Sequence, residues 1–208
     1  MLSKHRLLDL VQNFILFDNN IKKIARHQQY FAINKSMDRI NGKDGSTSKG
    51  GVIWHTQGSG KSLTVVLLVK KIQAEKGQEN PRFIIVTDRV NLDKQIRDNF
   101  ANSQMSPVRA ATGKGLNALL KNKENIVITT LINKFETVYR NKYLEPDSDR
   151  FYVLVDEAHR SQYKAMFNYM KEVLPNATLI AFTGTPLIAK AKKNTYKTFG
   201  EPIHNYTM

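Results

Sequence analysis

Residues Gly51–Lys71 read GVIWHTQGSGKSLTVVLLVKK, and they carry the strongest fold signal in the chain. The apolar run Val52–Trp54 is followed by a polar turn with two glycines, and from Lys61 onward apolar residues recur at helical spacing. A strand, a loop and a helix in this order bring backbone N–H groups together at the positive end of the helix, where phosphate oxygens are stabilised. The stretch therefore predicts a phosphate-binding loop within an α/β domain.

The residues of this loop have complementary uses. Gly58 and Gly60 allow backbone angles and a close approach that a side chain would block. Lys61 can reach the terminal phosphates of a nucleotide, and Ser62 can place its hydroxyl on Mg²⁺. The usual pattern, G-x-x-x-x-G-K-[ST], has a small residue where His55 stands. The alternative is a strand–turn–helix junction with a solvated lysine, so nucleotide binding needs support from a second site.

Composition and charge narrow the class of protein. The 208 residues are enough for one α/β domain with a full core. A total of 32 Lys and Arg against 18 Asp and Glu gives a net charge of +14, which favours a polyanion such as nucleic acid. A lysine-rich solvated surface is the alternative. The chain has no cysteine, which excludes disulfides, and no apolar stretch of membrane-spanning length. We expect a soluble, cytoplasmic protein without membrane contact.

Strand and helix signals alternate along most of the chain. Apolar runs predict strands at Val52–His55, Phe83–Thr87, Ile126–Thr130, Phe151–Val155 and Thr178–Phe182. Helical patterns lie between them, at Lys61–Lys76, Asn91–Phe100, Gly115–Lys121, Leu131–Tyr139 and Ser161–Val173. Such alternation predicts a parallel sheet covered by helices on both faces. Ligands of such sheets bind at the carboxyl ends of the strands.

Residues 1–41 are predicted to form a helical extension that precedes this domain. Arg6–Phe17 and Ile24–Ile40 carry apolar side chains at helical spacing, and the polar run Asp18-Asn19-Asn20 separates them. A polar loop rich in glycine and serine follows at residues 41–50. We therefore expect an N-terminal helical linker at 1–41 and an α/β domain at 42–208.

A pair of carboxylates supplies the second site that the loop requires. Asp156 and Glu157 follow the strand Phe151–Val155, at the edge of the sheet where Lys61 is expected. Asp156 can hold Mg²⁺ together with Ser62, and Glu157 can orient and deprotonate the attacking water. The alternative is that both carboxylates only cap the next helix.

Other strand ends carry polar residues suited to phosphates. Thr183 and Thr185 follow the strand Thr178–Phe182, beside the acidic pair, where their hydroxyls can sense a γ-phosphate. Arg89, Thr130 and Lys134 follow two further strands and are suited to contacts with a nucleic-acid backbone. Each of these signals is weak alone, since a turn arginine is more often solvated.

The motifs together resemble a known family. TQGSGKS, VTDR, ITT, DEAH and TGTP, in this order and spacing, resemble motifs I, Ia, Ib, II and III of superfamily 2 helicases and translocases. More narrowly, ARHQQYFA, GGVIWHTQGSGKSLT, VTDRVNLDKQI, VDEAHRSQ and FTGTPL resemble the motor (restriction) subunit of type I restriction–modification enzymes. The resemblance covers nearly the whole chain. It implies a first RecA-like lobe, which is a three-layer α/β domain with a mainly parallel sheet.

The resemblance also implies roles for particular residues. Arg26 and Gln29 match the Q motif, which recognises adenine; on the residues alone, Gln29 is a polar position of an amphipathic helix. His159 joins the two threonines of the TGTP motif as a coupling residue. Asn133 stands where the family has glutamine, in LINKF, which is a departure at a DNA-contacting motif. The implied nucleotide-binding set is Arg26, Gln29, Thr56, Gly58, Ser59, Gly60, Lys61 and Ser62.

The implied parent enzyme uses ATP and Mg²⁺ to move double-stranded DNA past itself before cutting it. It works in complex with methyltransferase and specificity subunits. Roughly two dozen residues follow Thr185, too few for the second lobe and its arginine finger, and no nuclease motif precedes the first helix. Because such an arginine contributes about 10³–10⁵ in rate, we expect this chain alone to bind ATP·Mg²⁺ but to hydrolyse it slowly.

Two other interpretations stay open. One is another superfamily 2 member, such as a type III restriction subunit or an RNA helicase. The other is a non-catalytic nucleic-acid-binding module with a RecA-like fold, against which the intact Lys61, Asp156 and Glu157 argue.

Overall fold

A parallel sheet organises the computed structural model, which describes residues 3–18, 21–103, 105–122, 127–145, 147–156, 164–184 and 195–207. Within these residues seven strands pair side by side, all in parallel, in the order β5-β6-β4-β7-β8-β3-β9. Their bounds are β3 Gly51–His55, β4 Arg82–Thr87, β5 Val108–Ala110, β6 Val127–Leu131, β7 Phe151–Asp156, β8 Thr178–Thr183 and β9 Pro202–Tyr206. Each strand predicted from the sequence is present.

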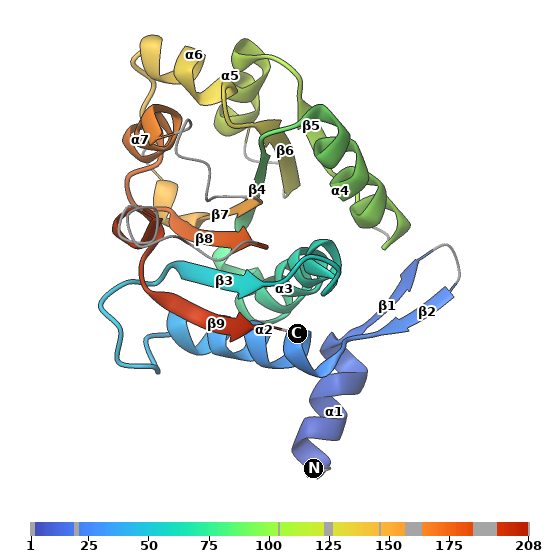
Figure 1. Cartoon of the computed structure of the whole chain (residues 1–208). Coiled ribbons are helices and arrows are strands. Elements are labelled where there is room, and N and C mark those ends of the chain that lie inside the picture. The colour runs from blue at the N-terminus through green and yellow to red at the C-terminus, as the bar shows by residue number, and fades with distance from the viewer. Residues whose placement is uncertain are drawn as a thin grey trace.

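Helices cover both faces of this sheet (Figure 1). One face packs against α2 (His27–Ile40), α3 (Lys61–Lys76) and α4 (Val90–Asn102), and the opposite face packs against α5 (Gly113–Lys121), α6 (Lys134–Arg140) and α7 (Lys164–Val173). Two short 3-10 helices, η1 (Gly77–Glu79) and η2 (Ser148–Arg150), lie in connections. Each face has its own buried apolar cluster, so the predicted three-layer α/β architecture is confirmed.

Helix α3 is the central helix of its layer and has the predicted bounds. Val66, Leu68 and Val69 are completely buried, and each such side chain contributes about 1.5–3 kcal/mol relative to an exposed one. The helix begins directly after Gly60, whose φ of +88° is left-handed, a conformation that favours glycine. The sheet and this turn therefore fix where the first turn of α3 points.

The N-terminal segment differs from the prediction of two long helices. Helix α1 (Lys4–Asn13) ends before the expected Phe17, and α2 begins at His27 rather than Ile24. Between them, β1 (Ile15–Asp18) and β2 (Ile21–Ile24) pair in antiparallel register as a hairpin, which projects from the sheet beside α1 (Figure 1). Phe14 and Leu16 enter the core, which a continued helix would prevent. The sequence signal for this hairpin was the run ILFD-NN-IKKI, in which two short strands flank two asparagines.

Smaller differences lie elsewhere in the sheet. Helix α6 begins at Lys134 rather than Leu131, because Leu131 is the last residue of β6 and pairs with Thr87. Strands β5 and β9 were not predicted. Strand β9 starts with Pro202 and pairs with β3 at the edge of the sheet, a position that tolerates a residue without an N–H.

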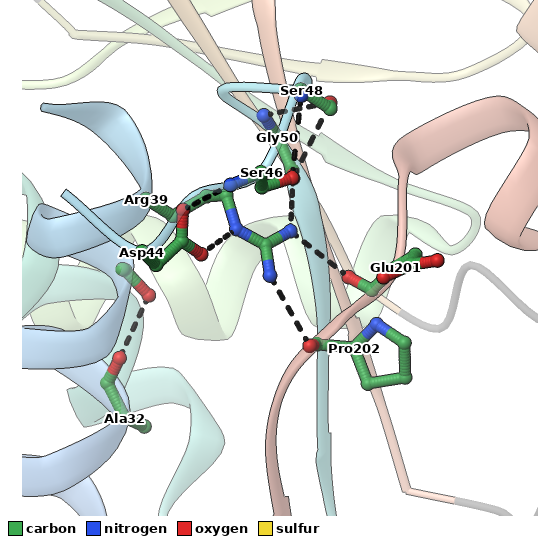
Figure 2. A network of polar contacts seen from close by, with 9 residues as sticks. Ala32, Arg39, Asp44, Ser46, Ser48, Gly50, Glu201 and Pro202 are labelled. Carbon is green, nitrogen blue, oxygen red and sulfur yellow. Dashed lines mark hydrogen bonds and ion pairs between the residues drawn. The ribbon is translucent and has the colours of Figure 1, made fainter. Parts of the chain in front are cut away.

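Helix α2 is fastened to the sheet at its carboxyl end by Arg39. The guanidinium donates to the carbonyl oxygens of Gly50 (3.1 Å), Glu201 (3.5 Å) and Pro202 (3.4 Å) and pairs with Asp44 (Figure 2). Ile33, Met37 and Ile40 of the same helix are buried in the core of the sheet. Helix α2 therefore shares one core with β3 and β9.

Among the helices that the structure describes, none has both the length and the apolar character needed to cross a membrane.

Candidate nucleotide-binding site

The sheet order brings the predicted motifs to one edge. Strand β8 lies between β3 and β7, with Trp54 opposite Thr183 and Asp156 opposite Phe182. Because all three strands are parallel, the loop after β3, the end of β8 and the end of β7 share the carboxyl edge of the sheet. The loop of residues 56–61, hereafter called the P-loop after the sequence pattern that it resembles, is therefore two strands away from Asp156.

Lys61 lies over the end of β8. Its Nζ donates to the carbonyl oxygens of His55 (3.3 Å) and Thr56 (3.5 Å). A Cβ atom added at Gly184 would lie only 2.8 Å from the same Nζ. The lysine of the P-loop thus touches the glycine of the TGTP motif, and a side chain at residue 184 would displace the ammonium group.

The P-loop has features of an anion cradle. Gly58 and Gly60 have φ of +83° and +88°, and the turn is closed by a hydrogen bond from the Ser59 N–H to the Thr56 carbonyl (3.2 Å). Thr56 Oγ1 and Ser59 Oγ are buried without a hydrogen-bond partner among the described residues. Buried hydroxyls normally have partners, so these two are suited to a ligand. Together with the start of α3, the loop fits a polyphosphate.

Helix α2 holds the far end of the P-loop. Gln28 Nε2 donates to the Ser59 carbonyl (3.3 Å), and Gln29 Nε2 donates to the Gly60 carbonyl (3.0 Å). Gln29 Oε1 accepts from the Arg26 N–H (2.8 Å). Gln29 is only 3% exposed and is bonded at both ends of its amide, whereas Arg26 is exposed. In this arrangement Gln29 fastens the P-loop, a contact that the sequence did not suggest.

Strand β9 holds the near end of the P-loop. The Thr56 N–H donates to the Tyr206 carbonyl (3.2 Å), and His55 Nε2 lies 2.9 Å from His204 Nδ1. His55 is completely buried, and this burial, with His204 and Lys61 nearby, lowers the pKa of His55 to about 4. Burial also lowers the pKa of His204. His55 is therefore neutral at pH 7.

These contacts explain the departure from the usual loop pattern. The side chain of His55 points to β9 instead of into the loop, so the position does not need a small residue. The sequence reading missed Gln28, His204 and Tyr206. Gln28 had a signal, since it lies beside Gln29 in ARHQQYFA, but nothing in the sequence pairs His55 with a residue 149 positions later.

The remaining predicted site residues lie as follows. Ser62 is half-buried in the first turn of α3, Asp156 is half-buried at the end of β7, and Thr183 is completely buried at the end of β8. Glu157, His159 and Thr185 lie outside the described residues. Asp156 and Thr183 therefore share the edge of the P-loop, as expected from the parallel sheet.

The predicted nucleic-acid rim is only partly exposed. The side chain of Arg89 is 62% exposed beside Asp88, and Lys134 is half-buried at the start of α6. Thr130 is 1% exposed, and its hydroxyl donates to the Ala110 carbonyl (3.4 Å) inside the sheet. This burial corrects the expectation that the hydroxyl of Thr130 lies on the rim, because the neighbouring strand β5 covers it.

Comparison with known proteins gives the family to which this fold belongs. The family model of the SWI2/SNF2 ATPases matches residues 28–208, and the chain belongs to this family. A solved SWI2/SNF2 ATPase core from Sulfolobus solfataricus, in complex with double-stranded DNA, has the same fold. That comparison has a TM-score of 0.65 at 19% identity and covers 91% of this chain and 37% of the other.

The relatives found by sequence similarity belong to a narrower class of protein, the endonuclease subunits of type I restriction enzymes. The chain is 34% identical to the type I restriction enzyme HindI endonuclease subunit of Haemophilus influenzae, over 97% of this chain and 22% of that protein. It is 28% identical to the type I restriction enzyme SsaAORF53P endonuclease subunit of Staphylococcus saprophyticus, over 99% of this chain and 22% of that protein. The resemblance to type I restriction subunits is therefore confirmed, and the chain spans about a fifth of the length of these relatives.

Proposed function

We propose that this chain is the first ATP-binding lobe of a type I restriction subunit, in which ATP hydrolysis drives movement along double-stranded DNA. The observation that carries the proposal is the contact of the P-loop lysine with the end of β8, which joins two motifs at one strand edge. Two buried hydroxyls of the P-loop, which have no partner in the part of the chain that the structure describes, support a phosphate ligand at the same place.

The proposed roles follow from position and chemistry. Lys61 and the N–H groups at the start of α3 would hold the phosphates, with Gly58 and Gly60 permitting their approach. Ser62 and Asp156 would hold Mg²⁺, which neutralises charge that develops on the phosphates. Glu157 would orient and deprotonate the attacking water, and His159, Thr183 and Thr185 would couple hydrolysis to movement. Arg26 and Gln29 would face the adenine side of the site.

The proposed nucleic-acid partner is double-stranded DNA, reached through Arg89 and Lys134 and supported by a net charge of +14. The structural relative in complex with double-stranded DNA and the type I restriction relatives support this choice. Methyltransferase and specificity subunits are proposed as further partners. If phosphates provide the contacts, the logarithm of the binding constant should fall linearly with the logarithm of the salt concentration.

The test of the nucleotide site is the replacement Lys61→Ala. We expect calorimetry with ATP·Mg²⁺ to detect binding by the unmodified chain and at least about a tenfold loss in the variant, since a charge-assisted contact is removed. Lys76→Ala is the matched control, because it removes the same charge from the exposed end of the same helix, where Lys76 pairs with Glu79 (3.0 Å). Equal affinity in all three proteins would remove the P-loop assignment.

Measuring ATP hydrolysis and nucleic-acid binding with duplex DNA and with RNA distinguishes the proposed function from the two other interpretations. Slow ATP hydrolysis that duplex DNA stimulates, or DNA binding without RNA preference, supports the proposal. Preferential stimulation by RNA favours an RNA helicase, and nucleic-acid binding without any ATP binding favours a non-catalytic module. Vigorous DNA-stimulated hydrolysis by this chain alone would contradict the expectation that a second lobe is needed.

A further inference from the structure

His55 occupies the first position of the P-loop pattern, yet its side chain belongs to a contact outside the loop. The rings of His55 and His204 lie 5.1 Å apart at an interplanar angle of 69°, joined by the 2.9 Å contact between Nε2 and Nδ1. His55 Nδ1 is buried without a partner among the described residues. A buried N–H without an acceptor is costly, so the favoured tautomer carries its proton on Nε2 and donates it to His204.

The backbone of His55 contacts Lys61 directly. Its carbonyl oxygen accepts a hydrogen bond from Lys61 Nζ, and the next residue, Thr56, is bonded through its N–H to the Tyr206 carbonyl. Strand β9 therefore holds His55 through its side chain and Thr56 through its N–H, so a shift of β9 would act on the backbone on either side of the carbonyl beneath Lys61. The position of β9 is thereby linked to the position of the ammonium group.

The contact extends from β9 to helix α2. The ring of Tyr206 lies 5.8 Å from that of His55 and 5.6 Å from that of His27, the first residue of α2. These contacts join the rings of His27, His55, His204 and Tyr206 into one group. Helix α2 also supplies Gln28 and Gln29 to the other end of the P-loop. Strand β9 and α2 therefore hold the loop at both ends.

We propose that His204 is a positioning residue for the P-loop, acting through His55 to hold the start of the loop and Lys61 in a nucleotide-binding arrangement. The inference rests on the proposed function, and it means that β9 contributes to the affinity for nucleotide. It predicts that His204 matters only while His55 is present. His204 itself need not touch the nucleotide.

The first experiment compares His204→Leu with His204→Asn by calorimetry with ATP·Mg²⁺. Leucine removes the acceptor, and we expect affinity to fall about tenfold, the effect of one buried hydrogen bond. The Oδ1 atom of asparagine can take the place of His204 Nδ1, so we expect this variant to stay within about threefold of the unmodified chain. Equal affinity of the folded leucine variant and the unmodified chain would overturn the proposal.

A double-mutant cycle tests the route through His55. In a His55→Ala background we expect His204→Leu to cause no further loss of affinity, because the contact is already absent. A tenfold loss that persists in this background would show that His204 acts by another route, and would overturn the proposal.

Hydrogen exchange gives a readout that does not depend on nucleotide. We expect the amides of Thr56 and Ser59 to exchange faster in His204→Leu than in the unmodified chain, while amides of the distant helix α5 keep their rates. If the leucine variant is too unstable, His55→Ala is measured in the same way. Unchanged exchange in the P-loop contradicts the inference. Failure of the unmodified chain to bind ATP·Mg²⁺ would instead remove the proposed function and leave the exchange result valid.

Discussion

Replacement of Arg39 by methionine tests whether a buried arginine holds α2 and β9 to the sheet (Figure 2). Arg39 is 7% exposed and donates to three carbonyl oxygens from two segments more than 150 residues apart in sequence. Methionine preserves most of the apolar stem but supplies no donor. The replacement therefore removes the polar contacts and leaves the packing largely intact.

The expected loss of stability can be worked from the individual contacts. One bond, to the Gly50 carbonyl, has a normal length of 3.1 Å, and two are long, at 3.4 and 3.5 Å. A hydrogen bond from a charged group contributes about 1.5–3 kcal/mol, so one full and two weaker bonds give a gross loss of about 3–5 kcal/mol. The ion pair with Asp44 is lost as well, but it adds little because Asp44 is exposed.

Two of the three carbonyl oxygens still accept hydrogen bonds from other donors after the replacement. The Glu201 carbonyl also accepts from the Val52 N–H (3.2 Å), and the Gly50 carbonyl accepts from Ser48 Oγ (3.5 Å). The desolvation of Arg39 itself, which opposes folding, also disappears in the variant. We therefore expect a net decrease of about 2–4 kcal/mol in the free energy of unfolding.

Urea denaturation followed by circular dichroism measures this decrease. With a slope of about 3 kcal/mol/M, a loss of 3 kcal/mol lowers the midpoint by about 1 M. The matched control is Arg140→Met, since Arg140 is 72% exposed and pairs with Glu136 on the same helix (2.7 Å). Such exposed pairs contribute little to stability, so Arg140→Met should hardly move the midpoint. The reasoning is refuted if Arg39→Met and Arg140→Met shift the midpoint equally.

Two further predictions concern the candidate site. Because the pKa of His55 falls from 6.5 to about 4 on folding, its contribution is fully present above pH 6.5 and is lost as pH falls toward 4. The free energy of unfolding should decrease by up to about 3 kcal/mol over this range. Urea titrations at pH 7.5 and 4.5 measure this decrease, and His55→Gln should make it smaller. The same decrease in His55→Gln and in the unmodified chain would contradict the burial argument. Gly184→Ala should displace the Lys61 ammonium, so calorimetry should show ATP·Mg²⁺ binding weakened about tenfold with little loss of stability. The control is Gly77→Ala, where no atom lies within 4 Å of the added Cβ, and we expect it to change neither the affinity nor the stability. Wild-type affinity in Gly184→Ala would show that the contact has no part in binding.

Local patterns predicted much of the architecture. Helix α3 begins at Lys61 and ends at Lys76 as expected, because a glycine turn before it and an apolar run within it are both local signals. The five predicted strands are present because buried parallel strands are continuous apolar runs. The hairpin β1–β2 was missed because a polar run was interpreted only as the end of a helix, although it also separates two strands.

The strand–loop–helix unit, the order of the motifs and their place at the carboxyl ends of strands could be predicted from the sequence, because each depends on residues close together in the chain. The partners that hold those motifs became known only from the folded chain. Three contacts join segments that are distant in the chain: His55 pairs with His204, Gln29 donates to the Gly60 carbonyl, and Lys61 contacts Gly184. Their geometry depends on the order in which strands pair and on how helices pack over them, and no local pattern encodes that order.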